Sequence, residues 1–279
     1  MIRRDVPALL AGVLVASPVA VGATYSALAA VGLAGTGADG FTWAPVARVL
    51  TDAQTWRGLG WTLATAGTAT LLASAAACAL AVRLQDSRLG QQLALLPMAV
   101  PHVAAALAAL FMLGQSGLLS RVARVFGLAA QPGDFPALVY DPAGVSLVLA
   151  FAWKELPYLT LTALAVLLTR SEALEEVART LGATARQAFW RVTWPVLWRG
   201  TSPAVIAAFA FLVGQYEMPA LLAPSDPTAL PLLTYERSVD PDLGRRGEAH
   251  VLGLLALGLS AALVLLQARW RGRSGTSAH

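Results

Sequence analysis

Six long apolar segments divide the chain and restrict what it can fold into. They lie at about 8–33, 60–82, 93–115, 143–168, 201–223 and 249–267. Each is long enough to cross, as a helix, a hydrocarbon core of about 30 Å. Only 13% of the 279 residues are charged and 57% are hydrophobic, whereas about 25% of the residues of a soluble protein are charged. The sequence therefore predicts an all-α, polytopic membrane protein: six transmembrane helices in a single domain over residues 1–279.

The distribution of arginine predicts the orientation of these helices. Most arginines flank the two termini or fall in the loop at 169–200, and fewer lie in the loops on the other side. Basic loops tend to stay in the cytoplasm, so both termini are expected there. The arginines are scattered between apolar blocks, which indicates a bilayer and not a nucleic acid as the surrounding partner.

The loops on the opposite side are too short for a ligand-binding domain, because independent domains usually need about 50 residues or more. One of them contains the sequence LLSRVARVFGLA, in which apolar residues recur at helical spacing with Arg121 and Arg124 on the other side. This pattern favours a short interfacial helix over a plain loop.

The loop at 169–200 has a distinctive local pattern. Thr169 and Glu172 have the spacing of a capping box, so a helix is expected to begin there. Gly182 follows at a position where a helix commonly ends with positive φ. Thr184 and Gln187 have the spacing of a second capping box. The sequence therefore predicts a helix, a sharp corner and another helix projecting from the membrane.

Apolar and aromatic residues complete this loop. Val177 and Leu181 lie on the apolar side of the first predicted helix. Trp190, Trp194 and Trp198 follow at four-residue spacing near the fifth span, as expected of aromatic anchors at a membrane interface. Such a rigid bracket is suited to transmitting force to a soluble partner.

The same loop resembles the cytoplasmic signature of permease subunits of ATP-binding-cassette importers, the EAA motif of the binding-protein-dependent transport family. That signature is written EAA, three residues, Gly, nine residues and then I-x-L-P. Its positions are occupied here by Glu176, Val177, Ala178, Gly182, Val192, Trp194 and Pro195. The spacing matches throughout, and Val177, Val192 and Trp194 replace the family's Ala, Ile and Leu.

The resemblance implies a function and a set of partners. The first helix of the bracket would be the coupling helix that docks on an ATPase subunit, with coupling assigned to Glu176, Ala178, Gly182, Val192 and Pro195. The permease would pair with a second copy or a homologous chain in the bacterial inner membrane. An extracytoplasmic solute-binding protein would deliver the solute. The chain would be a transporter and not an enzyme.

The sequence contains no P-loop motif for binding ATP. A P-loop needs the run GxxxxGK[ST], whose lysine reaches the phosphates. The single lysine of this chain, Lys154, stands in the sequence AWKELPY. We therefore expect no cofactor on this chain and ATP on the partner ATPase.

Polar residues inside the predicted spans are candidates for function, because charges in lipid cost at least a few kcal/mol. The candidate translocation pathway consists of Lys154, Glu155, Tyr158, Gln215 and Glu217. An equally weighted alternative is that Lys154 and Glu155 form an ion pair that locks the bundle. The run GQYEMPALLAP resembles permeases for polyamines, ferric iron, thiamine and phosphonates, which gives these solutes a slight preference.

Two other classes of protein are also compatible with parts of the sequence. An ion-driven secondary transporter could use Glu155, Glu217 and Lys154 as a relay, but it has no need of the cytoplasmic bracket. An integral-membrane enzyme or a metal site would need clustered catalytic or metal-binding side chains. The three histidines are far apart in the sequence, and His102 is expected to be a packed or pore-facing polar residue.

Overall fold

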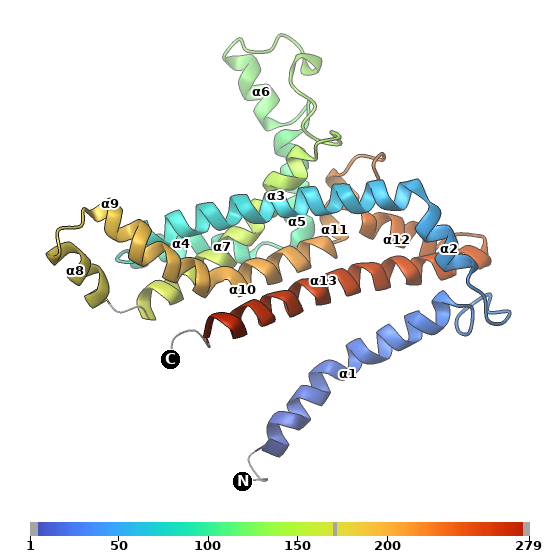
Figure 1. The fold of residues 1–279 in the computed structure, drawn as a ribbon. Coiled ribbons are helices and arrows are strands. Elements are labelled where there is room, and N and C mark those ends of the chain that lie inside the picture. The colour runs from blue at the N-terminus through green and yellow to red at the C-terminus, as the bar shows by residue number, and fades with distance from the viewer. Residues whose placement is uncertain (1–4, 170–171, 276–279) are drawn as a thin grey trace. The chain divides into compact units, whose positions relative to one another are not determined.

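The computed structural model describes residues 5–169 and 172–275, and the described backbone is helical and contains no strand. Six helices are long and apolar enough to cross a membrane, which confirms the predicted fold class. They are Leu10–Ala30, Ala53–Leu84, His102–Val125, Val145–Thr169, Ala185–Val213 and Leu243–Arg269. Figure 1 shows the order of the helices along the chain.

The chain forms two compact units, one from Met1–Leu59 with Thr228–Ala261 and another from Gly60–Pro227 with Ala262–His279. The first unit contains α1 (Asp5–Ala30), α2 (Ala44–Thr51), the start of α3 (Ala53–Leu84), α12 (Leu230–Ser238), the 3-10 turn η4 (Leu243–Arg245) and the start of α13 (Arg246–Gly275). Its core joins residues distant in sequence: Ala30, Val49, Leu230, Leu233, Val251 and Leu252. Burial of this apolar surface holds the short helices on α13.

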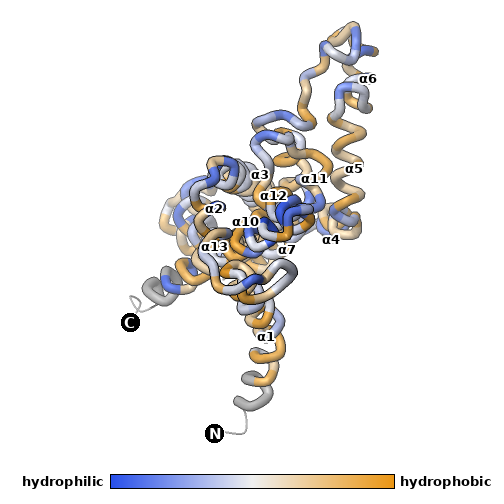
Figure 2. Tube along the Cα trace, turned by 90° about the vertical axis from the view of Figure 1, so that its right-hand side faces the viewer, coloured by the Kyte–Doolittle hydropathy of each residue, from blue (hydrophilic) through white to orange (hydrophobic). Residues whose placement is uncertain are grey.

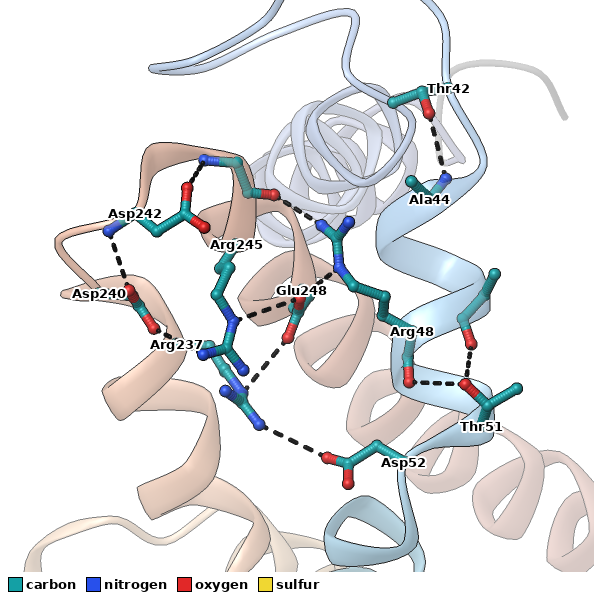
Figure 3. Close-up of polar contacts among 12 residues, drawn as sticks. Thr42, Ala44, Arg48, Thr51, Asp52, Arg237, Asp240, Asp242, Arg245 and Glu248 are labelled. Atoms are coloured by element: carbon teal, nitrogen blue, oxygen red, sulfur yellow. Dashed lines mark hydrogen bonds and ion pairs between the residues drawn. The ribbon is translucent and has the colours of Figure 1, made fainter.

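A buried carboxylate joins four segments of the first unit (Figure 3). Glu248 of α13 pairs with Arg48 of α2 at 2.6 Å, with Arg237 of α12 at 3.3 Å and with Arg245 of η4 at 3.7 Å. Arg237 also pairs with Asp52, just before α3, at 3.5 Å. A buried carboxylate needs such partners, because an uncompensated charge in the interior is costly.

The second unit contains the remaining helices. They are the rest of α3 and α13, α4 (Arg88–Leu95), η1 (Leu96–Ala99), α5 (His102–Leu113), α6 (Leu118–Val125), η2 (Pro132–Asp134), α7 (Val145–Thr169), α8 (Glu172–Thr180), α9 (Ala185–Ala188), the π-helix η3 (Phe189–Thr193), α10 (Trp194–Val213) and α11 (Glu217–Leu222).

Small residues bring α3, α7 and α10 together in this unit. Ala73 and Ala77 of α3 pack with Leu159 of α7 and with two alanines of α10. Gly200 of α10 faces Val166 of α7 so closely that an added Cβ would lie 2.6 Å from a Val166 methyl group. Such small residues let helix backbones approach each other where lipid provides no hydrophobic drive for association.

Two of the six spans differ from the prediction: the third is interrupted, and the fifth has different bounds. The third, expected at 93–115, is interrupted because Val100 and Pro101 have extended ψ angles of 123° and 149°. The fifth, expected at 201–223, begins earlier and ends at Val213, and α11 follows after a short break. Pro195 does not delay its start, because proline is tolerated in the first turn of a helix.

Candidate functional site

The predicted corner between two helices is present in the loop that follows α7. Gly182 has a φ of +89°, a conformation that side chains other than glycine rarely adopt. Backbone hydrogen bonds from Gly182 to Arg179 and from Ala183 to Ala178 close the end of α8. Figure 1 shows α8 and α9 at one end of α10. We call the segment from α8 to η3 the bracket.

The second capping box is confirmed, whereas the first depends on the Glu172 side chain and on residues 170–171, which lie outside the described part of the chain. The Thr184 hydroxyl accepts from the backbone N–H of Gln187, and the Gln187 side chain accepts from the backbone N–H of Thr184. Thr169, however, is the last residue of α7, and its hydroxyl donates to the carbonyls of Ala165 and Val166. The apolar run of α7 therefore extends its helix through Thr169, and α8 begins at Glu172.

A hydrogen bond fixes α8 against the start of the fifth span. The Thr193 hydroxyl donates to a carboxylate oxygen of Glu175 at 2.9 Å, and Thr193 is buried. This contact joins η3 to α8 across the corner at Gly182. The bracket is thus closed by a tertiary contact in addition to its local turns.

The motif residues occupy different environments in the bracket. Glu176 and Gly182 are exposed, and Ala178, Val192 and Pro195 are partly buried. The apolar side chains of Val177 and Leu181 on α8 are 53% and 83% exposed. The bracket therefore presents an apolar surface with nothing over it in the described structure.

The three tryptophans form a ladder beside the bracket. The ring centroids of Trp190 and Trp194 lie 5.4 Å apart, and those of Trp194 and Trp198 lie 6.3 Å apart with nearly parallel planes. Trp190 lies in the π-helical turn η3, and Trp194 and Trp198 lie in α10. The turn η3 connects α9 to α10 without a break in the helix.

A polar cavity of about 370 Å³ lies in the second unit, between α5, α7 and α10. It is lined by Met98, His102, Lys154, Glu155, Tyr158, Ala207, Ala208 and Phe211. Three of the five candidate pathway residues, Lys154, Glu155 and Tyr158, are therefore brought together. The structure adds His102 from the first turn of α5, which the sequence placed only as a packed or pore-facing residue.

The alternative in which Lys154 pairs with Glu155 is not realised, because no ion pair joins these two side chains in the described structure. The buried ammonium group of Lys154 donates to the backbone carbonyls of Pro97 at 2.9 Å and Val100 at 2.7 Å. Neighbouring positions on a helix point in different directions, so Lys154 and Glu155 are poorly placed to pair. The lysine instead satisfies carbonyl groups at the interruption between η1 and α5.

Gln215 and Glu217 are not among the residues that line this cavity, although Glu217 is near enough to the lining residue His102 to interact with it electrostatically. They lie at the break between α10 and α11, where the Gln215 side chain accepts from the backbone N–H of Glu217 at 3.4 Å. Glu217 is exposed. Among residues 5–169 and 172–275, no three side chains of histidine, cysteine, aspartate or glutamate form a group that could hold a metal ion.

Comparison with known proteins identifies the family. The model of the family described as "Binding-protein-dependent transport system inner membrane component" matches residues 87–270. The molybdenum transport system permease protein ModB of Mycobacterium tuberculosis is 34% identical over 188 residues, which cover 66% of this chain and 65% of that protein. The sulfate transport system permease protein CysT of Synechocystis is 30% identical over 174 residues, covering 61% of this chain and 56% of CysT. The matches thus span less than two thirds of these relatives.

A solved structure has the same fold over nearly the whole chain. It is a bacterial ABC transporter involved in the import of the acidic polysaccharide alginate, with a TM-score of 0.72 and 18% identity, covering 98% of this chain and 97% of that one. The family match includes the bracket, the polar cavity and the fifth and sixth spans. The chain belongs to the family of binding-protein-dependent transport system inner membrane components.

Proposed function

We propose that this chain forms the translocation pathway of an ATP-driven importer and contains none of its ATPase machinery. The observation that carries the proposal is the bracket, whose corner at Gly182 and capping box at Thr184 hold α8 in a fixed direction at the end of α10. Membership of the permease family supports the same role. The ATPase subunits, a second permease and an extracytoplasmic binding protein would be separate chains.

In this proposal α8 is the coupling helix. Val177 and Leu181 would enter a groove on the ATPase, because burial of exposed apolar side chains favours association. Glu176 would lie at the edge of that contact. Glu175 and Thr193 would carry movement of α8 into α10, since their hydrogen bond joins the two parts of the bracket. Both termini and the bracket would then be cytoplasmic, as the arginine distribution predicts.

The polar cavity is the proposed part of the pathway in this chain. Glu155, Tyr158 and His102 line it, whereas the Lys154 ammonium is held by two backbone carbonyls. Gln215 and Glu217 would contribute separately, at the break between α10 and α11. The ATP cycle would shift the bundle between two states that expose the pathway to opposite sides.

The proposed solute is a tetrahedral oxyanion such as molybdate or sulfate. The sequence alone gave a slight preference to polyamines, thiamine, iron and phosphonates. The relatives ModB and CysT are named for molybdenum and sulfate transport, and this supports an oxyanion. The test is stimulation of the ATPase activity of the reconstituted importer by its binding protein loaded with molybdate, sulfate or spermidine. Stimulation by spermidine alone would overturn this choice of solute.

A matched pair of variants tests the coupling role. Val177 and Val239 are both 53% exposed, but they lie in loops that successive spans place on opposite sides of the membrane. We expect Val177→Asp to abolish copurification of a P-loop ATPase from native membranes, and Val239→Asp to leave it unchanged. Equal recovery of the ATPase with both variants would contradict the proposal. Absence of an ATPase from the wild-type preparation would favour an ion-driven transporter instead.

A further inference from the structure

The helix α6 and the turn after it expose a continuous set of apolar side chains. Val125 is 83% exposed, Phe126 is 74% exposed and Leu128 is 79% exposed. Leu118 and Val122 of the same helix are also exposed. Apolar surface in water costs about 25 cal/mol per Å². A set of this size therefore indicates that another phase or molecule covers it.

Two arginines flank this apolar side of α6, because Arg121 is three residues after Leu118 and four before Val125, and Arg124 lies further round the helix. The Nε of Arg121 donates to the backbone carbonyl of Ser116 at 3.2 Å, and the described structure pairs neither Arg121 nor Arg124 with a carboxylate. The acid of the next loop, Asp134, is engaged within its own turn, where it accepts from the backbone N–H groups of Ala130 and Gln131. These bonds hold the pKa of Asp134 below its ordinary value. The arginines are thus available to an external anion.

The position of α6 in the chain is next to the end of an apolar helix. It follows the apolar helix α5 after a short turn closed by a hydrogen bond from Gly117 to Gly114 at 2.8 Å. Figure 2 shows α5 as a mainly hydrophobic stretch leading to α6. Although the apolar segment His102–Val125 includes α6, the turn at 114–117 ends α5 before it, and a span that ends with α5 would leave α6 at the membrane surface before the chain returns through α7.

We propose that α6 and residues 126–128 form a lipid anchor at this surface, independent of the coupling role. Val125, Phe126 and Leu128 enter the acyl-chain region, and Arg121 and Arg124 bind phosphate oxygens of anionic phospholipids. An amphipathic helix whose arginines flank its apolar residues has the chemistry for this position, because their long side chains can reach the headgroups while the apolar residues enter the acyl chains. Continuity with a transmembrane segment and the unpaired positive charge favour lipid over a docked protein as the occupant.

Site-directed spin labelling tests the immersion directly. In a Cys78→Ser background, a nitroxide is attached at Val125→Cys and, as a control in the following loop, at Ala130→Cys. In phosphatidylglycerol liposomes we expect the Val125→Cys label to collide more often with oxygen than with a water-soluble nickel chelate, and the Ala130→Cys label to show the reverse. Preferential access of the chelate to position 125 would overturn the proposal. Shielding of position 125 from both reagents would also overturn it, because a protein would then cover the helix.

A second comparison tests the lipid class. The oxygen-to-nickel ratio at position 125 is expected to be at least about twofold higher in phosphatidylglycerol than in phosphatidylcholine, because basic residues are attracted to anionic membrane surfaces. Arg124→Gln should remove most of this difference. Arg186→Gln, an exposed arginine of α9, should preserve it. Equal ratios in the two lipids with Arg124 intact would overturn the assignment of an anionic lipid.

Discussion

The ammonium group of Lys154, in the middle of α7, lies 2.7 Å from the backbone carbonyl oxygen of Val100, where the third span is interrupted. A carbonyl group that leaves a helix within a membrane needs another donor, because lipid supplies none. The lysine provides this donor and also binds Pro97 at 2.9 Å. The Lys154 ammonium, a candidate member of an ion relay in the sequence, therefore stabilises the interrupted backbone before α5. This backbone places His102 at the cavity.

Replacement of Lys154 by methionine tests this role. Lys154→Met keeps the apolar stem but leaves the carbonyls of Pro97 and Val100 without their donor. We expect a loss of stability of about 1–3 kcal/mol, the usual cost of an unsatisfied buried polar group. Thermal unfolding followed by tryptophan fluorescence would measure it. Glu155→Gln is the matched control in the same cavity and should unfold near the wild-type temperature.

Glu155→Gln should increase uptake of an oxyanion while the protein remains folded, because the carboxylate repels an anion in the pathway. The carboxylate lines the cavity, and the amide has nearly the same shape but no negative charge. Uptake of molybdate or sulfate into proteoliposomes with the ATPase and binding protein present would rise, and copurification of the ATPase would stay unchanged. Normal uptake by this variant would exclude Glu155 from the pathway.

The arginine cluster around Glu248 should respond to loss of its shared carboxylate. Glu248→Gln leaves Arg48, Arg237 and Arg245 close together with less negative charge between them. Two of the three arginines are partly exposed and screened by solvent, so the expected loss is about 1–3 kcal/mol and not the full cost of a buried pair. Glu236→Gln on the exposed side of α12 is the control. Equal unfolding midpoints for the two variants would argue against the network.

Two glycine variants should have opposite effects on packing. Gly200→Ala places a methyl group 2.6 Å from a Val166 methyl, and the β-branched valine has little freedom to move away. We expect a loss of about 1–3 kcal/mol from this overpacking. For Gly67→Ala, the nearest atom belongs to Phe209 at 3.7 Å, an ordinary contact. This control should be neutral or slightly stabilising, and destabilisation of both variants to the same extent would contradict the packing argument.

Local patterns predicted the parts of the structure that depend on neighbouring residues. The capping box of Thr184 and Gln187 and the positive φ of Gly182 follow from short-range backbone chemistry, and both are present. The apolar segments likewise identified six spans, because length and composition decide whether a helix can cross a membrane. Thr169 has the spacing of a helix cap relative to Glu172, but it lies within α7 because the apolar run of that helix continues through it.

Contacts between distant segments were not predictable in this way. Nothing near Lys154 in the sequence indicates that its partners are the carbonyls of Pro97 and Val100, although two prolines four residues apart mark the interruption. The network of Glu248 combines residues from both ends of the chain. Thr193, the hydrogen-bond partner of Glu175, lies beyond the corner at Gly182. The distance between these two side chains depends on the angle between α8 and the helix that follows the corner.

The direction in which the bracket points depends on the number of residues in the π-helical turn at Phe189–Thr193. A π-turn acts as one extra residue inside an α-helix, and each residue turns an α-helix by about 100°. Deleting one residue between 189 and 193 would restore regular winding and rotate α8 and α9 about the axis of α10 by roughly that angle. A permease could therefore acquire or lose its fit to a given ATPase through a single-codon insertion or deletion that leaves the sequence of α8 itself unchanged.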